Sequence, residues 1–311
     1  MSTRSRVKRP LLIVITGPTA SGKSALAVEV ARRLDTEIIS SDSRQIYQGI
    51  PIVTATPTTE EMGGVRHHLI DVLPLDAYYS ASEFEQDALC ISNGLFESRG
   101  VAVVCGGSMM YVDALCNGID DIPTVPEGIR KSLMDEWKDR GDEWLLTRLQ
   151  CLDPVHYERV DKKNMKRVFH AVEISVTANK PYSSLTTGMK KERDFDILKI
   201  CLEGDRGKLF ERINSRVMHM MDAGLEEEAR TVYPMRRLNS LNTVGLKEMF
   251  AWFDGILTRD EAIARIQKNT RVYAKKQLTW YKRDSDMARL DFNEGIKNAD
   301  KILDMIRTVI R

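Results

Sequence analysis

The chain has 311 residues, 42% of them hydrophobic and 29% charged, a composition typical of a globular protein with one large core or two smaller ones. Its 46 basic and 45 acidic residues nearly cancel, so any nucleic-acid contact must come from a local cluster of cations. Five widely spaced cysteines exclude a zinc ribbon and a dense disulfide framework, and the apolar run after the basic start is too short to span a membrane. We therefore expect a cytoplasmic protein.

Short apolar runs predict the strands of a parallel sheet. The first is Leu11–Thr16, and others occupy residues 37–42, 101–107 and 195–203. Stretches with helical spacing separate the first three runs, which is the order of βαβ units. Residues 120–187 show helical spacing interrupted by prolines, and the chain after residue 203 is mostly helical. We therefore predict a core in two parts, residues 1–119 and 188–311, around a mostly helical insertion domain at 120–187.

The first predicted strand leads directly into "GPTASGKS", a complete G-x-x-x-x-G-K-[ST] loop that a helical stretch follows. This motif is typical of nucleotide-binding and ATP-binding proteins: backbone amides hold phosphate oxygens, the lysine adds a positive charge and the serine hydroxyl reaches Mg²⁺. The candidate phosphate-binding residues are Gly17, Thr19, Ala20, Ser21, Gly22, Lys23 and Ser24, with Ser24 as the metal ligand. The predicted fold class is α/β, a P-loop NTPase-like parallel sheet flanked by helices.

The position of a catalytic carboxylate leaves several functions open. ATPases and GTPases of this class usually place a carboxylate at the end of a second strand, but the run at 101–107 ends in Cys105, Gly106 and Gly107. Asp42, which ends the run at 37–42, could instead help to hold magnesium or act as a base on an incoming nucleophile. It could also be an ordinary N-cap or turn aspartate.

Seven short motifs follow one another along almost the whole chain. They read "GPTASGKS", "DSRQIY", "TATP", "HHLID", "CGGSMMY", "AVEI" and "YAKKQLTW". In this order the chain resembles the tRNA dimethylallyltransferases, also called tRNA isopentenyltransferases. The resemblance implies transfer of a dimethylallyl group from dimethylallyl diphosphate to the exocyclic amine of an adenosine adjacent to the tRNA anticodon, with release of diphosphate.

The resemblance also implies catalytic roles, and the chemistry of the residues agrees with them. The loop amides, Lys23 and Ser24 with Mg²⁺ would hold the diphosphate, and Asp42 would accept a proton from the amine or orient it. Arg216, in "LFERINSRVMHMMDAGLEEE", matches the catalytic arginine of the family and could donate to the diphosphate as a fork. The alternative is a solvated arginine at the edge of that helix's apolar stripe.

A basic run without any acidic residue extends from Arg265 to Arg283 and predicts an RNA-binding helix. At helical spacing, one narrow stripe contains Lys268, Arg271, Lys275 and Lys282. Ile266, Tyr273 and Trp280 lie nearly opposite that stripe. We expect these apolar and aromatic side chains to pack in the core and not to stack on bases.

A second basic run, residues 161–170, lies in the predicted insertion domain and belongs to a segment that the family uses on tRNA. Because a base inside an anticodon arm must turn out into a pocket before it reacts, residues at the pocket mouth are also expected to touch RNA. By resemblance, the tRNA contacts outside the helix at 265–283 are Asp42, Ser43, Arg44, Gln45, Ser108, Arg130, Lys166, Arg167 and His170. We expect the enzyme to act as a monomer.

The sequence departs from the family pattern at five positions. They are Val53, Thr56, Met109, Met110 and His170, where glycine, lysine, a glycine-leucine pair and arginine are usual. The lost lysine and arginine predict weaker contacts with RNA or phosphate, and the methionines could reshape the pocket wall. Lys23, Asp42 and Arg216 are retained, so we expect the chemistry to be intact.

Three other functions are compatible with parts of the pattern. An enzyme that prenylates free adenine nucleotide would not need the basic helix or the insertion. A small-molecule kinase would use the phosphate loop and Asp42, but we find no obvious cluster of lid arginines. A non-catalytic RNA-binding module would not explain a complete phosphate loop.

Overall fold

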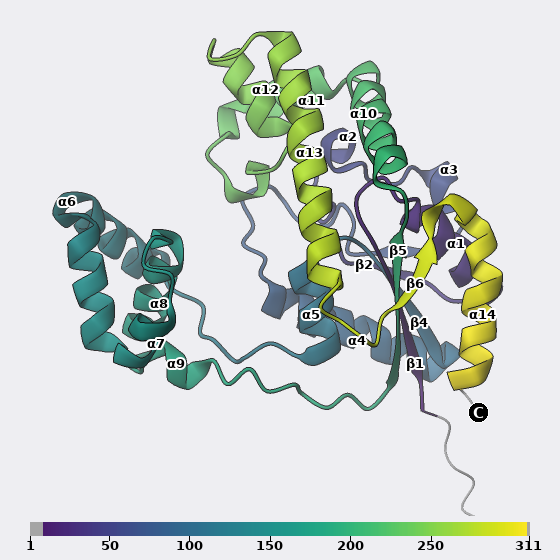
Figure 1. Ribbon diagram of the computed structural model, residues 1–311, viewed down its shortest axis with the longest axis horizontal. Helices are drawn as coiled ribbons and strands as arrows, with labels where there is room; N and C mark the ends of the chain where they lie inside the picture. The colour runs from purple at the N-terminus through teal and green to yellow at the C-terminus, as the bar shows by residue number, and fades with distance from the viewer. Residues whose placement is uncertain (1–8, 310–311) are drawn as a thin grey trace, which may run out of the picture. The chain divides into compact units, whose positions relative to one another are not determined.

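The computed structural model describes residues 9–309, and in that range six strands form one parallel sheet in the order β3-β2-β4-β1-β5-β6 (Figure 1). The strands are β1 Leu11–Thr16, β2 Ile38–Ser40, β3 His67–His68, β4 Val101–Cys105, β5 Asp196–Glu203 and β6 Ala288–Asp291. Central β1 pairs with β4 on one side and β5 on the other. Connections therefore leave β1 and β4 in different directions across the sheet, which opens a crevice at the carboxyl ends of the strands.

The helices fall into three groups along the chain. Those before residue 118 are α1 Lys23–Arg33, α2 Pro51–Thr54, α3 Thr59–Met62, α4 Ala81–Arg99 and α5 Met109–Asn117. The middle group is α6 Glu127–Leu152, α7 Pro154–Arg159, α8 Met165–Ala178 and α9 Tyr182–Leu185. The last group is α10 Arg206–Asp222, α11 Leu225–Val232, α12 Leu246–Phe253, α13 Arg259–Tyr281 and α14 Asn298–Val309, with 3₁₀ turns η1 Tyr233–Met235, η2 Asn239–Leu241 and η3 Phe292–Lys297. Within residues 9–309, no helix combines the length and apolar character needed to cross a bilayer.

The predicted fold class is confirmed, and the four predicted strands correspond to β1, β2, β4 and β5. The sequence interpretation missed β3 and β6, which lie at the two edges of the sheet. β3 has only two residues, and "ARLD" in β6 has one fully buried side chain, Leu290. Both pair with a neighbouring strand that is distant in sequence, so the local pattern is too short to predict them.

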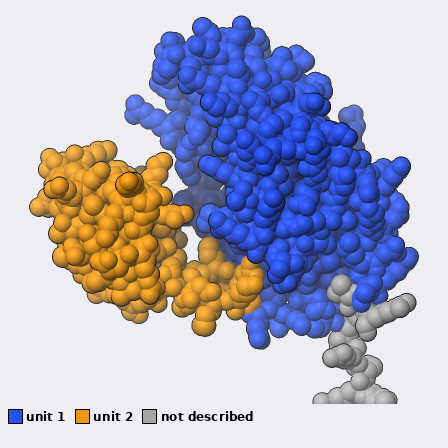
Figure 2. Space-filling view, viewed as in Figure 1, with its two compact units in different colours: residues 1–116, 192–311 blue, residues 117–191 orange. Residues whose placement is uncertain are grey.

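The chain divides into two compact units (Figure 2). One contains the sheet and extends up to residue 116 and from residue 192 onward; the other comprises residues 117–191, and the predicted insertion at 120–187 lies inside it. Residues 1–8 and 310–311 of the two predicted core parts lie outside the described residues. The second unit has its own apolar cluster, in which Leu145 and Leu149 of α6 pack with Val168 and Val172 of α8.

Alternating side chains of β1 place apolar layers on both faces of the sheet. Ile13 and Ile15 pack with α1 and α14 on one face, and Leu12 and Val14 pack in a cluster with α4 and α5 on the other. A further cluster joins α11, α12 and parts of α10 and α13 to the segment after β2, through residues such as Ile46. This cluster and the carboxyl ends of the strands enclose the candidate site.

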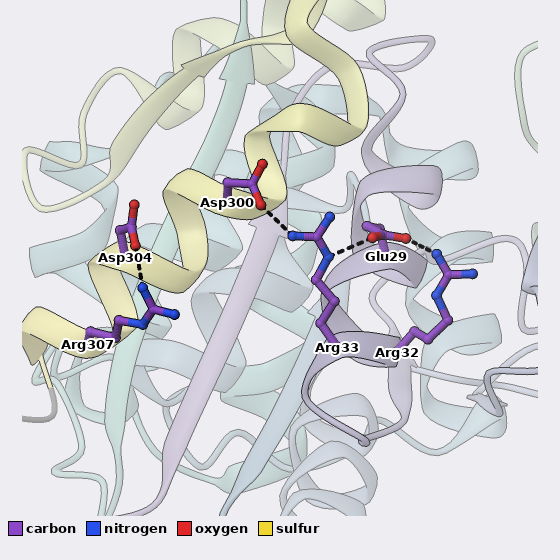
Figure 3. Close-up of polar contacts among 6 residues, drawn as sticks. All are labelled: Glu29, Arg32, Arg33, Asp300, Asp304 and Arg307. Atoms are coloured by element: carbon purple, nitrogen blue, oxygen red, sulfur yellow. Dashed lines mark hydrogen bonds and ion pairs between the residues drawn. The ribbon is translucent and has the colours of Figure 1, made fainter.

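An ion pair joins the C-terminal helix to α1, the helix that begins at the phosphate loop (Figure 3). Arg33 of α1 donates to Glu29 Oε1 at 2.6 Å and to Asp300 Oδ1 of α14 at 2.5 Å. Arg32 also donates to Glu29. The pair between Arg33 and Asp300 is exposed and screened by solvent, so the buried packing of Ile302 against the same face contributes more to the attachment.

Candidate active site

The phosphate loop connects β1 to α1 as the sequence predicts. The helix begins at Lys23, directly after Gly22. Arg32 and Arg33 lie in its last turn, where they interact favourably with the negative end of the helix dipole. The first amides of a helix have no acceptor within it, so the amides at Lys23 and Ser24 are suited to an anion.

Two of the predicted phosphate-binding residues use their amides inside the protein. The N–H of Thr19 donates to Gln277 Oε1 at 3.0 Å, and the N–H of Ser21 donates to the carbonyl oxygen of Pro18 at 3.3 Å. The Ser21 hydroxyl is buried and makes no hydrogen bond among the described residues. The capacity to bind an anion therefore lies mainly at the start of α1 and in the nearby cations.

A cavity of about 380 Å³ opens beside this loop. Of the predicted site residues, it brings together Thr19, Lys23, Ser24, Asp42, Ser43, Arg44, Gln45, Ser108 and Arg216. Gly17, Ala20, Ser21 and Gly22 belong to the loop but are not among its lining residues. The wall also includes residues 242–245 and Lys247, together with Tyr273 and Gln277 on α13.

Asp42 follows β2 and combines two of the roles that the sequence left open. Its Oδ1 accepts the N–H of Arg44 at 2.9 Å and that of Gln45 at 3.4 Å, which is the geometry of a turn aspartate. The half-buried carboxylate also lines the cavity. Among residues 9–309, no hydrogen-bond donor reaches its Oδ2, so this oxygen can accept a proton or bind a cation.

Two half-buried cations face the same cavity. Burial lowers the pKa of Lys23, whose Nζ lies 3.4 Å from the carbonyl oxygen of Pro18. Burial also lowers the pKa of Arg216, against the opposing attraction of Asp42, and its Nη1 donates to Thr19 Oγ1 at 3.1 Å. Two desolvated positive charges beside one half-buried carboxylate leave an excess that a bound anion would neutralise.

The affinity for inorganic pyrophosphate should fall as the pH rises through the lowered pKa of Lys23, because only the protonated amine attracts the anion. Because burial lowers the pKa of Lys23, this loss should occur below 10.5, the ordinary value for lysine. Lys23→Arg keeps a permanent charge and should remove this part of the profile. Calorimetric Kd values for pyrophosphate over a pH series, at constant Mg²⁺ and ionic strength, would measure this loss of affinity. Identical pH profiles for the wild type and Lys23→Arg would contradict the prediction.

The oxygen donors of the cavity fit a magnesium ion that is held largely by its substrate. Ser24 and Asp42 both line it, and the described residues contain no group of three or more His, Cys, Asp or Glu suited to a metal. Mg²⁺ commonly takes one or two protein oxygens together with phosphate oxygens and water. Burial raises the pKa of Cys105 to about 11, so this residue at the end of β4 carries a neutral thiol.

Arg44 and Gln45, predicted to touch the target base, also build the cavity wall. Arg44 Nη1 donates to the carbonyl oxygens of Asn239 at 2.8 Å and Ser240 at 3.0 Å. Gln45 Nε2 donates to the carbonyl oxygen of Ala55 at 3.0 Å. These hydrogen bonds hold both side chains in position in the absence of RNA.

Tyr273 is the residue of α13 for which the sequence expectation is wrong. It is 38% exposed and lines the cavity. Ile266 also lines the cavity but is buried, and Trp280 donates from Nε1 to Asp113 Oδ2 at 2.8 Å. Helical spacing places Tyr273 opposite the basic stripe, but that side of the helix faces a cavity at this level and not a packed core.

The basic stripe lies beside α10. Arg271 donates to Asn214 Oδ1 of that helix, and both Arg271 and Lys275 lie over the ring of Phe210. Lys268 is exposed. The three candidate cations therefore differ, because Arg271 also contributes to helix packing.

Charge reversal by Lys268→Glu should weaken tRNA binding and lower the slope of log Kd against log salt by about one to two phosphate contacts. Lys297→Glu, at an exposed lysine of η3 outside the basic helix, is the matched control. Filter-binding titrations at several salt concentrations would test it. An unchanged slope for Lys268→Glu would remove this helix from the tRNA interface.

In the second unit, Arg130 and His170 converge on Glu173, a carboxylate that is 1% exposed. Arg130 donates to it from Nε at 2.8 Å and from Nη2 at 2.7 Å, and His170 Nδ1 lies 3.1 Å from Glu173 Oε1. Burial would raise the pKa of Glu173, but these partners hold it below its usual value. Lys166 and Arg167 are exposed on the same helix, α8.

The structure shows the surroundings of Val53, Thr56 and Met110, three of the positions that depart from the family pattern. Val53 lies against Gly245, where a Cβ would meet its Cγ2 at 2.3 Å, so the pair requires glycine at 245. The hydroxyls of Thr56 and Thr54 are hydrogen-bonded at 2.8 Å. Met110 is 61% exposed. Val53 narrows the cavity, whereas Met110 adds exposed apolar surface at the start of α5.

The sequence interpretation missed Gln277 and the segment from Asn242 to Lys247. Gln277 lies in the quoted motif "YAKKQLTW", and a polar residue on the apolar side of a helix was the available signal. For the segment, Gly245 directly before a helix gave an equally weak indication. Neither sequence pattern predicts that Gln277 or this segment lines the cavity.

Residues 45–284 match the model of the IPP transferase family. The chain belongs to the IPP transferase family. Relatives in it include tRNA dimethylallyltransferase 2 of Parabacteroides distasonis, 52% identical over 276 residues that cover 89% of this chain and 92% of the relative, and tRNA dimethylallyltransferase 1 of Bacteroides thetaiotaomicron, 49% identical with 89% and 90% covered.

Solved structures in the same family agree with this assignment. The tRNA isopentenylpyrophosphate transferase of Bacillus halodurans is 33% identical, covers 97% of both chains and superposes with a TM-score of 0.72. A eukaryotic dimethylallyltransferase acting on tRNA is 25% identical, covers 91% of this chain and 74% of its own, and gives a TM-score of 0.78. The family resemblance that the ordered motifs predict is confirmed.

Proposed function

We propose that this member of the family, a tRNA dimethylallyltransferase, carries out transfer in the 380 Å³ cavity, with dimethylallyl diphosphate as donor and an adenosine beside the tRNA anticodon as acceptor. The observation that carries the proposal is the gathering of two half-buried cations, the start of α1 and a half-buried carboxylate in this one cavity. We further propose that the enzyme acts as a monomer.

The diphosphate is the leaving group and binds to the positive part of the cavity. As the bond between its oxygen and the allylic carbon breaks, negative charge grows on the diphosphate and positive charge grows on the carbon. Lys23, Arg216 and the amides at the start of α1 stabilise the departing anion. The Ser24 hydroxyl would hold Mg²⁺ together with the diphosphate, and the ion would supply further positive charge to the leaving group.

Asp42 acts on the acceptor. The exocyclic nitrogen of adenosine forms a bond to the allylic carbon and loses one proton, which the carboxylate accepts at Oδ2. This nitrogen is a weak nucleophile, so holding it in line with the breaking bond contributes more than basicity does. The bonds of Asp42 Oδ1 to the following amides fix the carboxylate for this purpose.

The target base has to leave its stack to enter the cavity. Tyr273 offers an exposed ring on the wall, and an aromatic face of this kind can stack on a base. The exposed cations Lys166 and Arg167 of the second unit and Lys268 of α13 favour a polyanionic acceptor over a free nucleotide.

The decisive test is transfer of label from radioactive dimethylallyl diphosphate, with Mg²⁺, to unmodified tRNA that carries adenosines beside the anticodon. Free AMP and ATP serve as parallel acceptors, and the same tRNA with guanosine at the target position is the control. Label in the first tRNA alone is expected. Label in the nucleotides alone would mean that the acceptor is a free nucleotide.

A further inference from the structure

Gln277 of α13 joins two loops at the carboxyl edge of the sheet. Its side chain is 2% exposed. Oε1 accepts the N–H of Thr19 at 3.0 Å, and Nε2 donates to the carbonyl oxygen of Gly107 at 2.8 Å. Thr19 follows β1 and Gly107 follows β4, two strands that pair directly. Since a side-chain amide has distinct donor and acceptor ends, these two partners fix its orientation.

The contact depends on a close approach of backbone and side chain. A Cβ at position 107 would lie 2.4 Å from Gln277 Nε2, so a residue other than glycine would displace the glutamine. The second glycine of "CGGSMMY" is therefore explained by this hydrogen bond. Both partners of the glutamine are backbone groups, and loss of the amide would leave a half-buried donor at Thr19 and a buried acceptor at Gly107 without a bond.

The glutamine also determines what Thr19 presents to the cavity. Because the Thr19 N–H is bonded to Gln277, the residue is held with its hydroxyl toward Arg216, whose Nη1 donates to it at 3.1 Å. Three residues from three distant elements thus form one hydrogen-bonded series, from α13 through the phosphate loop to α10. Tyr273, one turn before Gln277, lines the same cavity.

We infer that Gln277 is a positioning residue for the diphosphate site, which acts by holding Thr19 and, through it, the Arg216 guanidinium. The inference rests on the proposed binding of diphosphate beside the phosphate loop. A helix that contributes both the aromatic wall of the cavity and the support of the loop links the two substrate positions in one rigid element.

The test measures inorganic pyrophosphate binding by calorimetry in the presence of Mg²⁺, together with the KM for dimethylallyl diphosphate and the unfolding temperature. Gln277→Met preserves the length of the side chain and removes both hydrogen bonds, and should raise the pyrophosphate Kd and that KM by about tenfold. Gln277→Glu keeps an oxygen for the Thr19 amide but loses the donor to Gly107 and places a buried negative charge near the diphosphate, so its values should rise at least as much as those of Gln277→Met.

Gln267→Met is the matched control. This glutamine of the same helix donates from Nε2 to the carbonyl oxygen of Asn214 at 3.3 Å and has no contact with the phosphate loop. It should leave both constants unchanged, even if it lowers the unfolding temperature.

The outcomes distinguish the inference about Gln277 from the proposed function on which it rests. Wild-type pyrophosphate affinity in Gln277→Met, or in Gln277→Glu if the first variant does not fold, would overturn the inference and leave the proposed function standing. A wild-type protein that transfers label but does not bind pyrophosphate would overturn the proposed diphosphate site, and the inference with it.

Discussion

Asp42→Asn should lower kcat by about 10²- to 10³-fold and leave the Kd for tRNA nearly unchanged. Asparagine retains an oxygen for the amides of Arg44 and Gln45, so the turn after β2 is preserved. What it removes is the negative charge that accepts the proton of the amine and attracts the nearby cations. Single-turnover transfer to tRNA would measure the chemical step, and filter binding would measure the tRNA affinity.

Asp42→Ala provides the second arm of this experiment, because it removes the charge and the acceptor of the turn together. A larger effect of alanine than of asparagine on tRNA affinity would measure the contribution of the turn, which also positions Arg44 against the carbonyl oxygens of Asn239 and Ser240. Equal losses of turnover and tRNA affinity in Asp42→Asn would instead indicate an RNA-anchoring role. Turnover at the wild-type level would exclude Asp42 as the base.

The parts of the fold that the sequence predicts are those with a strong local pattern. β1 is six buried residues followed by a complete phosphate loop, so its position and that of α1 follow from contiguous residues. β3 and β6 are edge strands with little burial of their own, and their pairing depends on residues far away in the chain. The same distinction separates Lys23, which a motif identifies, from Gln277, whose partners lie 258 and 170 positions away.

Charge patterns in the sequence predict less about individual side chains. Lys268, Arg271 and Lys275 are equivalent on a helical wheel, but the neighbouring α10 makes Arg271 a packing residue. Arg130 was predicted from the resemblance alone, and its bidentate contact with Glu173 across 43 positions has no local signature. Tyr273 illustrates a related limit of apolar patterns. The spacing of apolar residues predicts which side of a helix faces inward, but not whether that side packs against protein or faces a cavity.

Arg216→Ala should lower kcat/KM for dimethylallyl diphosphate by about 10²- to 10³-fold, because it removes a half-buried hydrogen-bond donor beside the diphosphate, on which negative charge develops. Burial makes this charge costly in the free enzyme and effective once the anion is bound. Arg216→Lys retains a charge but loses the fork, and its activity should be intermediate. Initial rates at varied donor and saturating tRNA would give the three values.

Arg212→Ala is the matched control, since Arg212 precedes Arg216 by one turn on the same helix. The two arginines flank the same apolar stripe in the sequence, but the Arg212 guanidinium lies over the ring of Phe292, at 4.6 Å from its centroid, and Arg216 contacts Thr19 of the phosphate loop. We expect Arg212→Ala to keep wild-type kcat/KM. If both alanine variants lost activity equally, the effect would arise from the helix as a whole; if Arg216→Ala alone were impaired and its tRNA affinity were unchanged, the loss would be assigned to the diphosphate.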